Sequence, residues 1–194
     1  MKRKTSLAEI ADAAFRLFRE HGFDNVSVMG ICHEVGITKP TFYKFAASKD
    51  ALLSQYYQGA DETVLQEMAS LDLAGSYIEE IWAGTSCIMK RSSELGHDLY
   101  SHYVIRCLRS HTHPNTTGYE LQEHIEEAIR KAQKSGQILN HSDPRKIWLS
   151  LTNLFLGTGC QWAFGGGEEN VLQQCRHGFL ITLRPAVALP ELHS

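Results

Sequence analysis

The sequence of 194 residues lacks the long apolar runs that membrane proteins carry. A helix that crosses a bilayer needs about 18 or more consecutive apolar residues, and no stretch comes near that length. The N-terminus is charged and leads directly into a helical pattern, without the apolar core of a signal peptide. We therefore expect no membrane partner and a protein that stays in the cytoplasm.

Cysteine and proline are also scarce, with five of each. The cysteines are odd in number, widely spaced and without a CxxC pair, which favours buried reduced thiols over disulfides. Few prolines and few β-branched runs leave a helical interpretation unopposed. No nucleophile elbow, phosphate loop or HExxH pair is present, so we expect neither an enzyme nor a cofactor.

The net charge of −3 conceals an asymmetry between the two ends of the chain. Residues 1–50 hold eight Lys and Arg against six Asp and Glu, whereas the remainder holds eleven against sixteen. Affinity for phosphates depends on local charge, so an acidic protein can still bind DNA through one basic face. The lysines and arginine that could form such a face are Lys2, Arg3, Lys4, Lys39, Lys44 and Lys49.

The stretch from 25 to 53 predicts three short helices in close succession. Ser27 and Thr38 are suited to cap the first two helices, and Ser48 the third. Gly36 follows the last turn of the first helix, and Pro40 falls in the first turn of the second. This order is typical of a helix-turn-helix, whose second helix has the size and polarity to enter a DNA major groove.

Residues 5–53 resemble the DNA-binding domain of the tetracycline-repressor (TetR) family. The matching features are an amphipathic first helix ending in EHGFDNVSV, the GITKPTFYKF turn and recognition helix, and the SKDALL start of the next helix. The resemblance implies an all-α chain of about nine helices. A three-helix helix-turn-helix domain would occupy residues 1–48, and a ligand-binding and dimerisation domain residues 49–194. Ala46, Ala47 and Gly30 depart from the family pattern, which affects local packing rather than a DNA-facing group.

The family resemblance also implies a function. Its members are ligand-responsive DNA-binding regulators, most often repressors that a small molecule releases from the operator. The partners would be operator DNA, a second copy of the chain and a small-molecule effector. The residues that would touch bases or phosphates are Ser27, Thr38, Lys39, Pro40, Thr41, Tyr43, Lys44 and Lys49, with Tyr43 and Lys49 on the DNA backbone.

Beyond the first domain, the pattern predicts helices over residues 48–69, 75–91, 93–110, 117–135, 143–164 and 168–183. The helix over 143–164 is apolar almost all round and must be covered on several sides. The resemblance implies that the last two helices pair with those of a second subunit. The predicted seam is Leu149, Asn153, Leu156, Cys160, Leu172, Cys175 and Phe179. The alternative is a helix buried inside its own subunit.

An effector pocket could be lined by Tyr57, Trp82, Met89, Tyr103, Phe155 and Trp162, although the pattern of each one taken alone favours plain core. The ten histidines open a second possibility. His97, Asp98 and His102, or His111 with His113, could bind a metal in a metal-sensing regulator of the same fold. A helical interaction module without DNA binding is the remaining alternative. We expect no metal site, because neither group supplies a full ligand set at suitable spacing.

Overall fold

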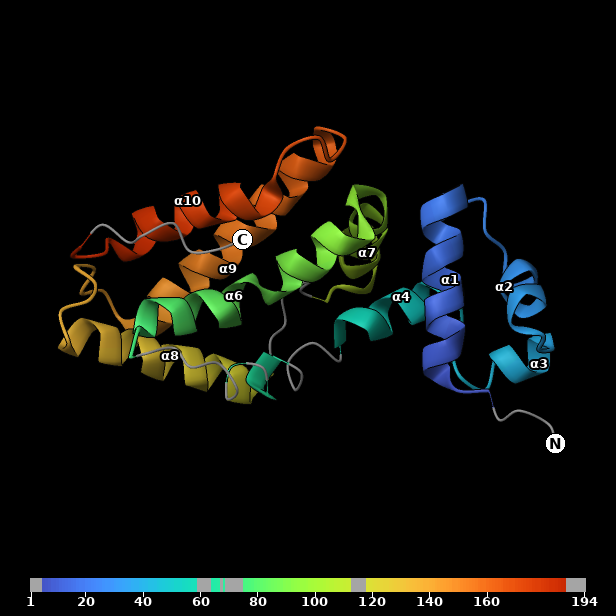
Figure 1. The fold of residues 1–194 in the computed structure, drawn as a ribbon, viewed down its shortest axis with the longest axis horizontal. Helices are drawn as coiled ribbons and strands as arrows, with labels where there is room; N and C mark the ends of the chain where they lie inside the picture. The colour runs from blue at the N-terminus through green and yellow to red at the C-terminus, as the bar shows by residue number, and fades with distance from the viewer. Residues whose placement is uncertain (1–4, 59–63, 67, 69–74, 113–117, 188–194) are drawn as a thin grey trace. The chain divides into compact units, whose positions relative to one another are not determined.

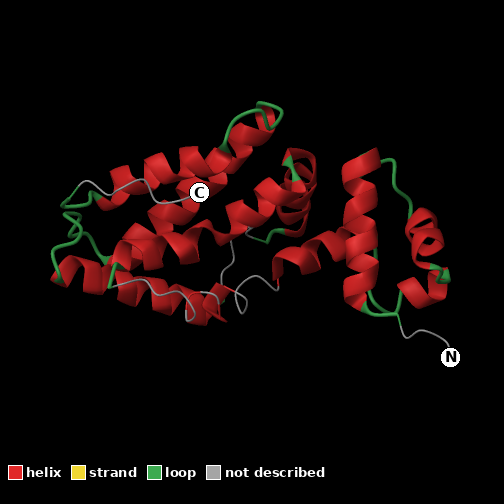
Figure 2. Ribbon diagram, viewed as in Figure 1, coloured by secondary structure: helices red, strands yellow, loops and turns green. Residues whose placement is uncertain are grey.

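The structure is a computed structural model, and it describes residues 5–58, 64–66, 68, 75–112 and 118–187. Every element named within these ranges is a helix, which confirms the all-α prediction (Figures 1 and 2). The helices are α1 (Leu7–His21), α2 (Val28–Val35), α3 (Lys39–Phe42), α4 (Lys49–Gln58), α6 (Tyr77–Leu95), α7 (His97–Ser110), α8 (Tyr119–Lys134), α9 (Pro144–Phe164) and α10 (Val171–Leu183). In the described part of the chain, none of them has the length and hydropathy to cross a membrane.

The internal contacts divide the chain into two compact units. The first unit comprises residues 1–59 and 91–114, and the second comprises residues 60–90 and 115–194. The boundary falls inside α6, between Lys90 and Arg91, so this one helix contributes to both units. By these contacts, α4 and α7 belong to the same unit as the N-terminal helices. The predicted division after residue 48 was instead one of function, between a DNA-binding domain and a ligand-binding and dimerisation domain.

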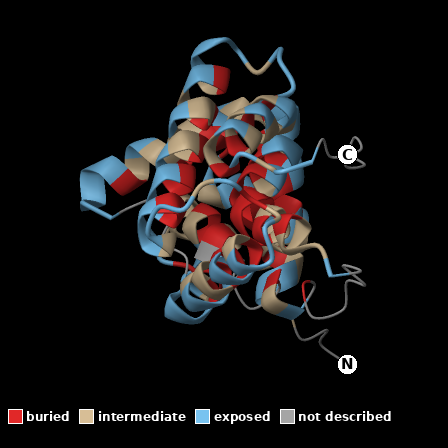
Figure 3. Ribbon diagram, turned by 90° about the vertical axis from the view of Figure 1, so that its left-hand side faces the viewer, coloured by how far each residue is buried: buried red, intermediate tan, exposed pale blue. Residues whose placement is uncertain are grey.

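Helix α1 forms the centre of the first unit. Its N-cap is Ser6, whose side chain accepts from the Glu9 amide while the Glu9 carboxylate accepts from the Ser6 amide. This reciprocal pair satisfies two amides that a helix start would leave free. The apolar stripe of α1 faces the core of the unit. Figure 3 colours buried residues red and exposed residues pale blue, and the helices carry both colours. The buried members of the α1 stripe are Ile10, Ala13, Ala14, Phe15 and Phe18.

The junction of α6 and α7 differs from the prediction, which placed a break near residue 92. Helix α6 continues through Ser92 and ends at Leu95. Ser92 does not cap a new helix, because it is buried and its Oγ lies 3.2 Å from the Tyr57 hydroxyl. Gly96 makes the break instead, with a φ of 91° that a residue with a side chain rarely adopts.

Helix α4 begins where the sequence predicted, with the Ser48 side chain accepting from the Ala51 amide at 3.0 Å. The described part of the helix ends at Gln58. Residues 64–66 and 68 are again helical. The predicted continuation to residue 69 also covers residues 59–63, 67 and 69, which lie outside the described residues.

The second unit is built around α8, α9 and α10. Asp143 caps α9, with its side chain accepting from the Lys146 amide at 3.2 Å and Pro144 in the first turn. Helices α9 and α10 pack closely at Gly178. A Cβ at that position would lie 2.7 Å from both terminal carbons of Leu154, so only glycine fits without movement.

Candidate nucleic-acid interface and internal cavity

The turn between α2 and α3 is built by local bonds that the sequence makes predictable. Ser27 caps α2 by accepting from the Gly30 amide at 3.1 Å. Gly36 then adopts a left-handed conformation (φ 72°, ψ 35°), and its amide bonds back to the end of α2. Thr38 starts α3 by accepting from the Thr41 amide at 3.4 Å. A hydroxyl that accepts a capping bond keeps its own hydrogen, so Ser27 can still donate to a ligand.

Helix α3 presents a polar face to solvent and anchors itself through one aromatic ring. Phe42 is completely buried. Thr41 is half-buried, and its hydroxyl lies 2.9 Å from that of Thr38. The other predicted DNA-contacting residues on and around this helix are exposed: Thr38, Lys39, Pro40, Tyr43 and Lys44. Lys39 in the helix and Lys44 just after it both lie at the surface.

The contacts of Lys49 differ from the role that the sequence suggested for it. We expected its ammonium to hold a DNA phosphate, but the group is occupied within the first unit. Nζ lies 2.6 Å from the carbonyl oxygen of Phe23, 3.0 Å from that of Val26 and 3.5 Å from that of Asp24. An ammonium has three donors, and here each one has an acceptor. Lys49 therefore fastens the α1–α2 loop to the start of α4.

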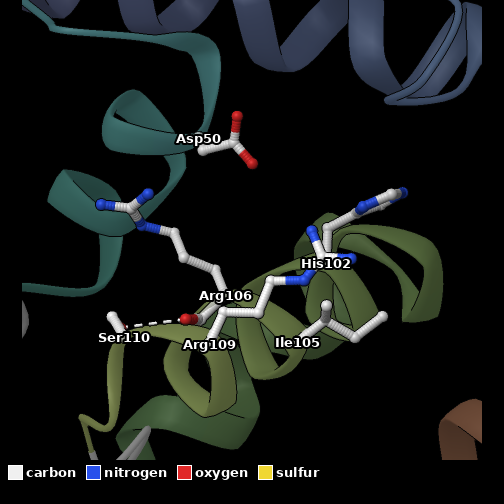
Figure 4. Close-up of a pocket in the computed structure, with 6 residues that line it drawn as sticks. All are labelled: Asp50, His102, Ile105, Arg106, Arg109 and Ser110. Atoms are coloured by element: carbon white, nitrogen blue, oxygen red, sulfur yellow. Dashed lines mark hydrogen bonds between the residues drawn. The ribbon is translucent and has the colours of Figure 1, made fainter.

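A surface groove of about 220 Å³ lies in the first unit between α4 and α7 (Figure 4). Arg106 spans it, donating from Nε to the Ser54 hydroxyl at 2.6 Å. The groove is lined by Asp50, His102, Ile105, Arg106, Arg109 and Ser110. Because the lining carries both an acidic and two basic side chains, the groove is not the basic face predicted for DNA binding.

The histidines do not assemble a metal site in the described residues. His102 lies 3.7 Å from the carboxylate of Asp98 and 3.8 Å from that of Asp24, and its ring lies against that of Phe23. His113, which the sequence paired with His111, lies outside the described residues. The His102 contacts instead join α7 to the loop that Lys49 holds.

The six predicted pocket residues do not gather at one place. Tyr57 and Tyr103 stack at 3.9 Å between ring centroids in the first unit, where burial raises the pKa of both phenols. Trp82 packs edge-on against Phe155 and Phe179 in the second unit. Trp162 is buried as plain core would be.

Two of the predicted pocket residues, Met89 and Phe155, line the same cavity in the second unit. It measures about 10 Å³ and is enclosed by α6, α8 and α9, with the lining Thr85, Ile88, Met89, Ile125, Trp148, Thr152 and Phe155. Sequence analysis missed Trp148, Thr85 and Thr152. The spacing of 148, 152 and 155 puts all three residues on one face of α9. This spacing could have predicted that Trp148 and Thr152 line the same cavity as Phe155.

The first domain matches a known protein family. Residues 4–56 match the family described as "Bacterial regulatory proteins, tetR family". The N-terminal domain is similar to that family over this stretch. A proposed mycofactocin biosynthesis transcriptional regulator of Mycobacterium tuberculosis, MftR, is 41% identical over 51 residues. That match spans 26% of each chain, so it covers about a quarter of the relative.

Solved structures of TetR-family proteins share the fold over nearly the whole chain. Thermus thermophilus FadR, a repressor crystallised with lauroyl-CoA, has a TM-score of 0.66 at 16% identity, covering 97% of this chain and 99% of its own. SmeT, the repressor of a Stenotrophomonas maltophilia multidrug efflux pump, has a TM-score of 0.64 at 18% identity, covering 98% of each. At such identities the likeness establishes the fold only.

Two of the predicted seam residues are corrected by their burial. Cys175 and Phe179 have no exposed surface in the single subunit, so they belong to its own core and cannot meet a partner. Helix α9, which was predicted to be apolar almost all round, has an inner face with Leu151 and Phe155 buried and an outer face with Leu149 exposed. The remaining predicted residues stay accessible, with Leu149 and Asn153 exposed and Leu156, Cys160 and Leu172 half-buried.

Proposed function

We propose that this chain is a DNA-binding transcriptional regulator that acts in the cytoplasm as a homodimer and is released from its operator by a small molecule. The observation that carries the proposal is the exposed polar face of α3, set by the Gly36 turn in a domain similar to the tetR family. Thr38, Lys39, Pro40, Thr41 and Lys44 are the proposed contacts to base edges and nearby phosphates.

The phosphate contacts follow from exposure and free donors. Tyr43, which is 52% exposed, and Lys44 are proposed to contact the DNA backbone from the C-terminal end of α3. Ser27 adds a donor at the start of α2, where the helix dipole also favours a phosphate. Lys49 is removed from this set because its ammonium is held by three carbonyl groups.

A second copy of the chain is proposed to cover the outer face of α9. Leu149, Asn153, Leu156 and Cys160 recur at three- and four-residue steps, so they form one stripe along that helix. An exposed apolar stripe of this kind is typical of a subunit interface. Two recognition helices in a twofold dimer would address half-sites about 34–36 Å apart.

Release by an effector is proposed to act through α6. Its residues Thr85, Ile88 and Met89 line the cavity of the second unit. A few residues further along, Arg91 belongs to the first unit and donates to the Tyr56 carbonyl oxygen of α4 at 3.0 Å. A displacement of α6 would therefore reach α4. A coupling free energy of about 1–3 kcal/mol would change DNA affinity about 5- to 150-fold.

Repression is the proposed mode of action. FadR from Thermus thermophilus and SmeT are both described as repressors, and the fold of this chain resembles theirs over nearly its full length. The effector of this chain does not follow from those names.

A gel-shift titration of the full-length protein tests the proposal, using the DNA upstream of its own gene. We expect a discrete complex at moderate salt, which weakens steeply as salt rises because Lys and Arg displace counterions from phosphates. Leu149→Glu should weaken the complex by splitting the dimer. Leu108→Glu, at a position on α7 that is more exposed than Leu149, is the control.

Sedimentation of the same samples separates the two parts of the proposal. A protein that is monomeric at micromolar concentration would refute the dimer. A dimer that binds its upstream DNA no better than unrelated DNA would refute operator recognition.

A further inference from the structure

Two buried polar groups in the second unit, Ser86 Oγ and Trp148 Nε1, have no hydrogen-bond partner in the described structure, and Trp148 is the one that lines a cavity. The indole nitrogen Nε1 of Trp148 has essentially no solvent exposure, and no protein atom accepts its hydrogen. Leaving a buried donor unsatisfied costs free energy, so such groups are rare and call for an explanation. Trp148 lines the cavity between α6, α8 and α9, where an acceptor could be placed.

Two hydroxyl groups line the same cavity and are oriented by their own helices. Thr85 donates from Oγ1 to the Ile81 carbonyl oxygen at 2.7 Å. Thr152 donates to that of Leu149 at 3.0 Å. With its hydrogen used, the Thr85 hydroxyl offers lone pairs. The cavity thus combines one donor, the indole N–H, with an acceptor that can receive a hydrogen in return.

The charge of the lining restricts the class of ligand. The residues around the cavity are the two threonines, Trp148 and the apolar Ile88, Met89, Ile125 and Phe155, with no ionisable side chain among them. A carboxylate or an ammonium placed there would be buried without a counter-charge, which is strongly unfavourable. A neutral hydroxyl group matches the lining on both counts, because it accepts one hydrogen bond and donates another.

The size of the cavity shows that its lining must part for a ligand. At about 10 Å³ the space holds about one water molecule. Met89 offers a flexible side chain that can rearrange at low cost. On the adjacent turn, a Cβ at Gly84 would lie 2.9 Å from Ile125, so the backbone of α6 is already in contact with α8. A ligand that enters must therefore displace side chains or α6 itself.

We propose that Trp148 anchors an uncharged, mainly apolar effector by donating its indole N–H to a hydroxyl oxygen of that ligand. The ligand's hydroxyl hydrogen is donated in return to the Thr85 hydroxyl oxygen. The proposal rests on the proposed function, since it names the class of effector and the atom that recognises it.

Binding of 1-octanol and of octanoate to the full-length protein tests this assignment. The two probes share a chain length and differ in the charge of the polar end. The indole N–H resonances of the ¹⁵N-labelled protein report on Trp148 directly, and the spectrum of Trp148→Phe assigns its signal. We expect 1-octanol to move that resonance and octanoate to leave it in place.

Affinities of variants supply the second measurement. Trp148→Phe keeps an aromatic ring but removes the donor, and should weaken 1-octanol binding about 5-fold. Trp162→Phe, the same exchange at a buried position of α9 outside the cavity lining, should leave the affinity unchanged. No movement of the Trp148 resonance, as expected for a water-filled cavity, would overturn the proposal. An equal response to octanoate, or wild-type affinity in Trp148→Phe, would do the same.

The gel-shift assay, run on the same preparations, keeps this inference separate from the proposed function. A protein that binds its upstream DNA but not 1-octanol refutes the anchor alone. One that binds 1-octanol through Trp148 but not DNA refutes the regulator and leaves the anchor standing.

Discussion

Lys49 and Phe23 are joined by two contacts at once. The Lys49 ammonium donates to the Phe23 carbonyl oxygen at 2.6 Å and lies 4.3 Å from the centre of the Phe23 ring. Helix α7 also holds Phe23, because the Phe23 amide donates to the Asp98 carboxylate at 3.4 Å. The α1–α2 loop is therefore fixed from α4 and from α7 within the first unit.

Lys49→Met should reduce the free energy of unfolding by about 2 kcal/mol, because the methionine stem fills the same space but leaves three carbonyl groups without their charged donor. Urea unfolding of the full-length protein measures the change. Lys44→Met is the control at an exposed position, where we expect a change within about 0.5 kcal/mol.

The same two variants should behave in the opposite way towards DNA. Lys44→Met should weaken binding to all sequences and lower the salt dependence by about one phosphate contact. Properly folded Lys49→Met should keep the wild-type salt dependence. A lowered slope for Lys49→Met would restore the role that the sequence first suggested for this residue.

Ser27→Asp should separate capping from DNA binding. Aspartate caps a helix about as well as serine, so the stability of the fold should change by no more than about 0.5 kcal/mol. The new charge would repel a phosphate at the start of α2, and we expect the affinity for DNA to fall at least tenfold at low salt. Undiminished gel-shift affinity in this variant would show that Ser27 lies away from the DNA.

Much of the first domain could be predicted from the sequence because its structure is fixed locally. Ser6, Ser27, Thr38 and Ser48 each cap the helix that follows, and Gly36 supplies the turn. These signals act over three or four residues, which a pattern can capture. The break at Gly96 was missed because Ser92 and Ser93 resemble a cap, and only a tertiary contact with Tyr57 shows that Ser92 is buried.

The candidate sites were harder to predict because they depend on partners distant in sequence. A lysine at a helix start looks the same whether it meets a phosphate or, like Lys49, the carbonyl groups of residues more than 20 positions earlier. The two faces of α9 and α10 are both apolar, so the sequence could not separate Phe179 of the inner face from Leu149 of the outer one.

Burial of Cys175 predicts a loss of stability at alkaline pH. Burial raises the pKa of this thiol from 9.0 to about 12, partly offset by a hydrogen bond with Thr158. Between these two values the unfolded chain has released the proton and the folded chain has kept it. The free energy of unfolding should therefore fall as pH rises, by about 1.4 kcal/mol per pH unit for this group. Urea unfolding at pH 8 and pH 10 should show a smaller decline in Cys175→Ala than in wild type.

Two glycines on facing helices allow a direct test of the dimer seam. Gly157 lies on the exposed stripe of α9, and a Cβ there would meet no atom of its own subunit within 4 Å. In an isolated subunit, Gly157→Ala should raise stability by up to about 1 kcal/mol through helix propensity. If a second α9 packs against this stripe, the added methyl group should instead weaken the dimer, and we expect its dissociation constant to rise about tenfold.

Gly178→Ala is the contrasting variant, because its new Cβ would meet Leu154 inside the subunit. It should lower the free energy of unfolding by about 1–3 kcal/mol whether or not the protein dimerises. Sedimentation over a dilution series, with urea unfolding of the same samples, distinguishes the two effects. A Gly157→Ala protein that gains stability and dimerises as wild type does would move the seam away from α9. A weaker dimer with an intact subunit would place the partner on the outer face of α9, where Leu149 is exposed.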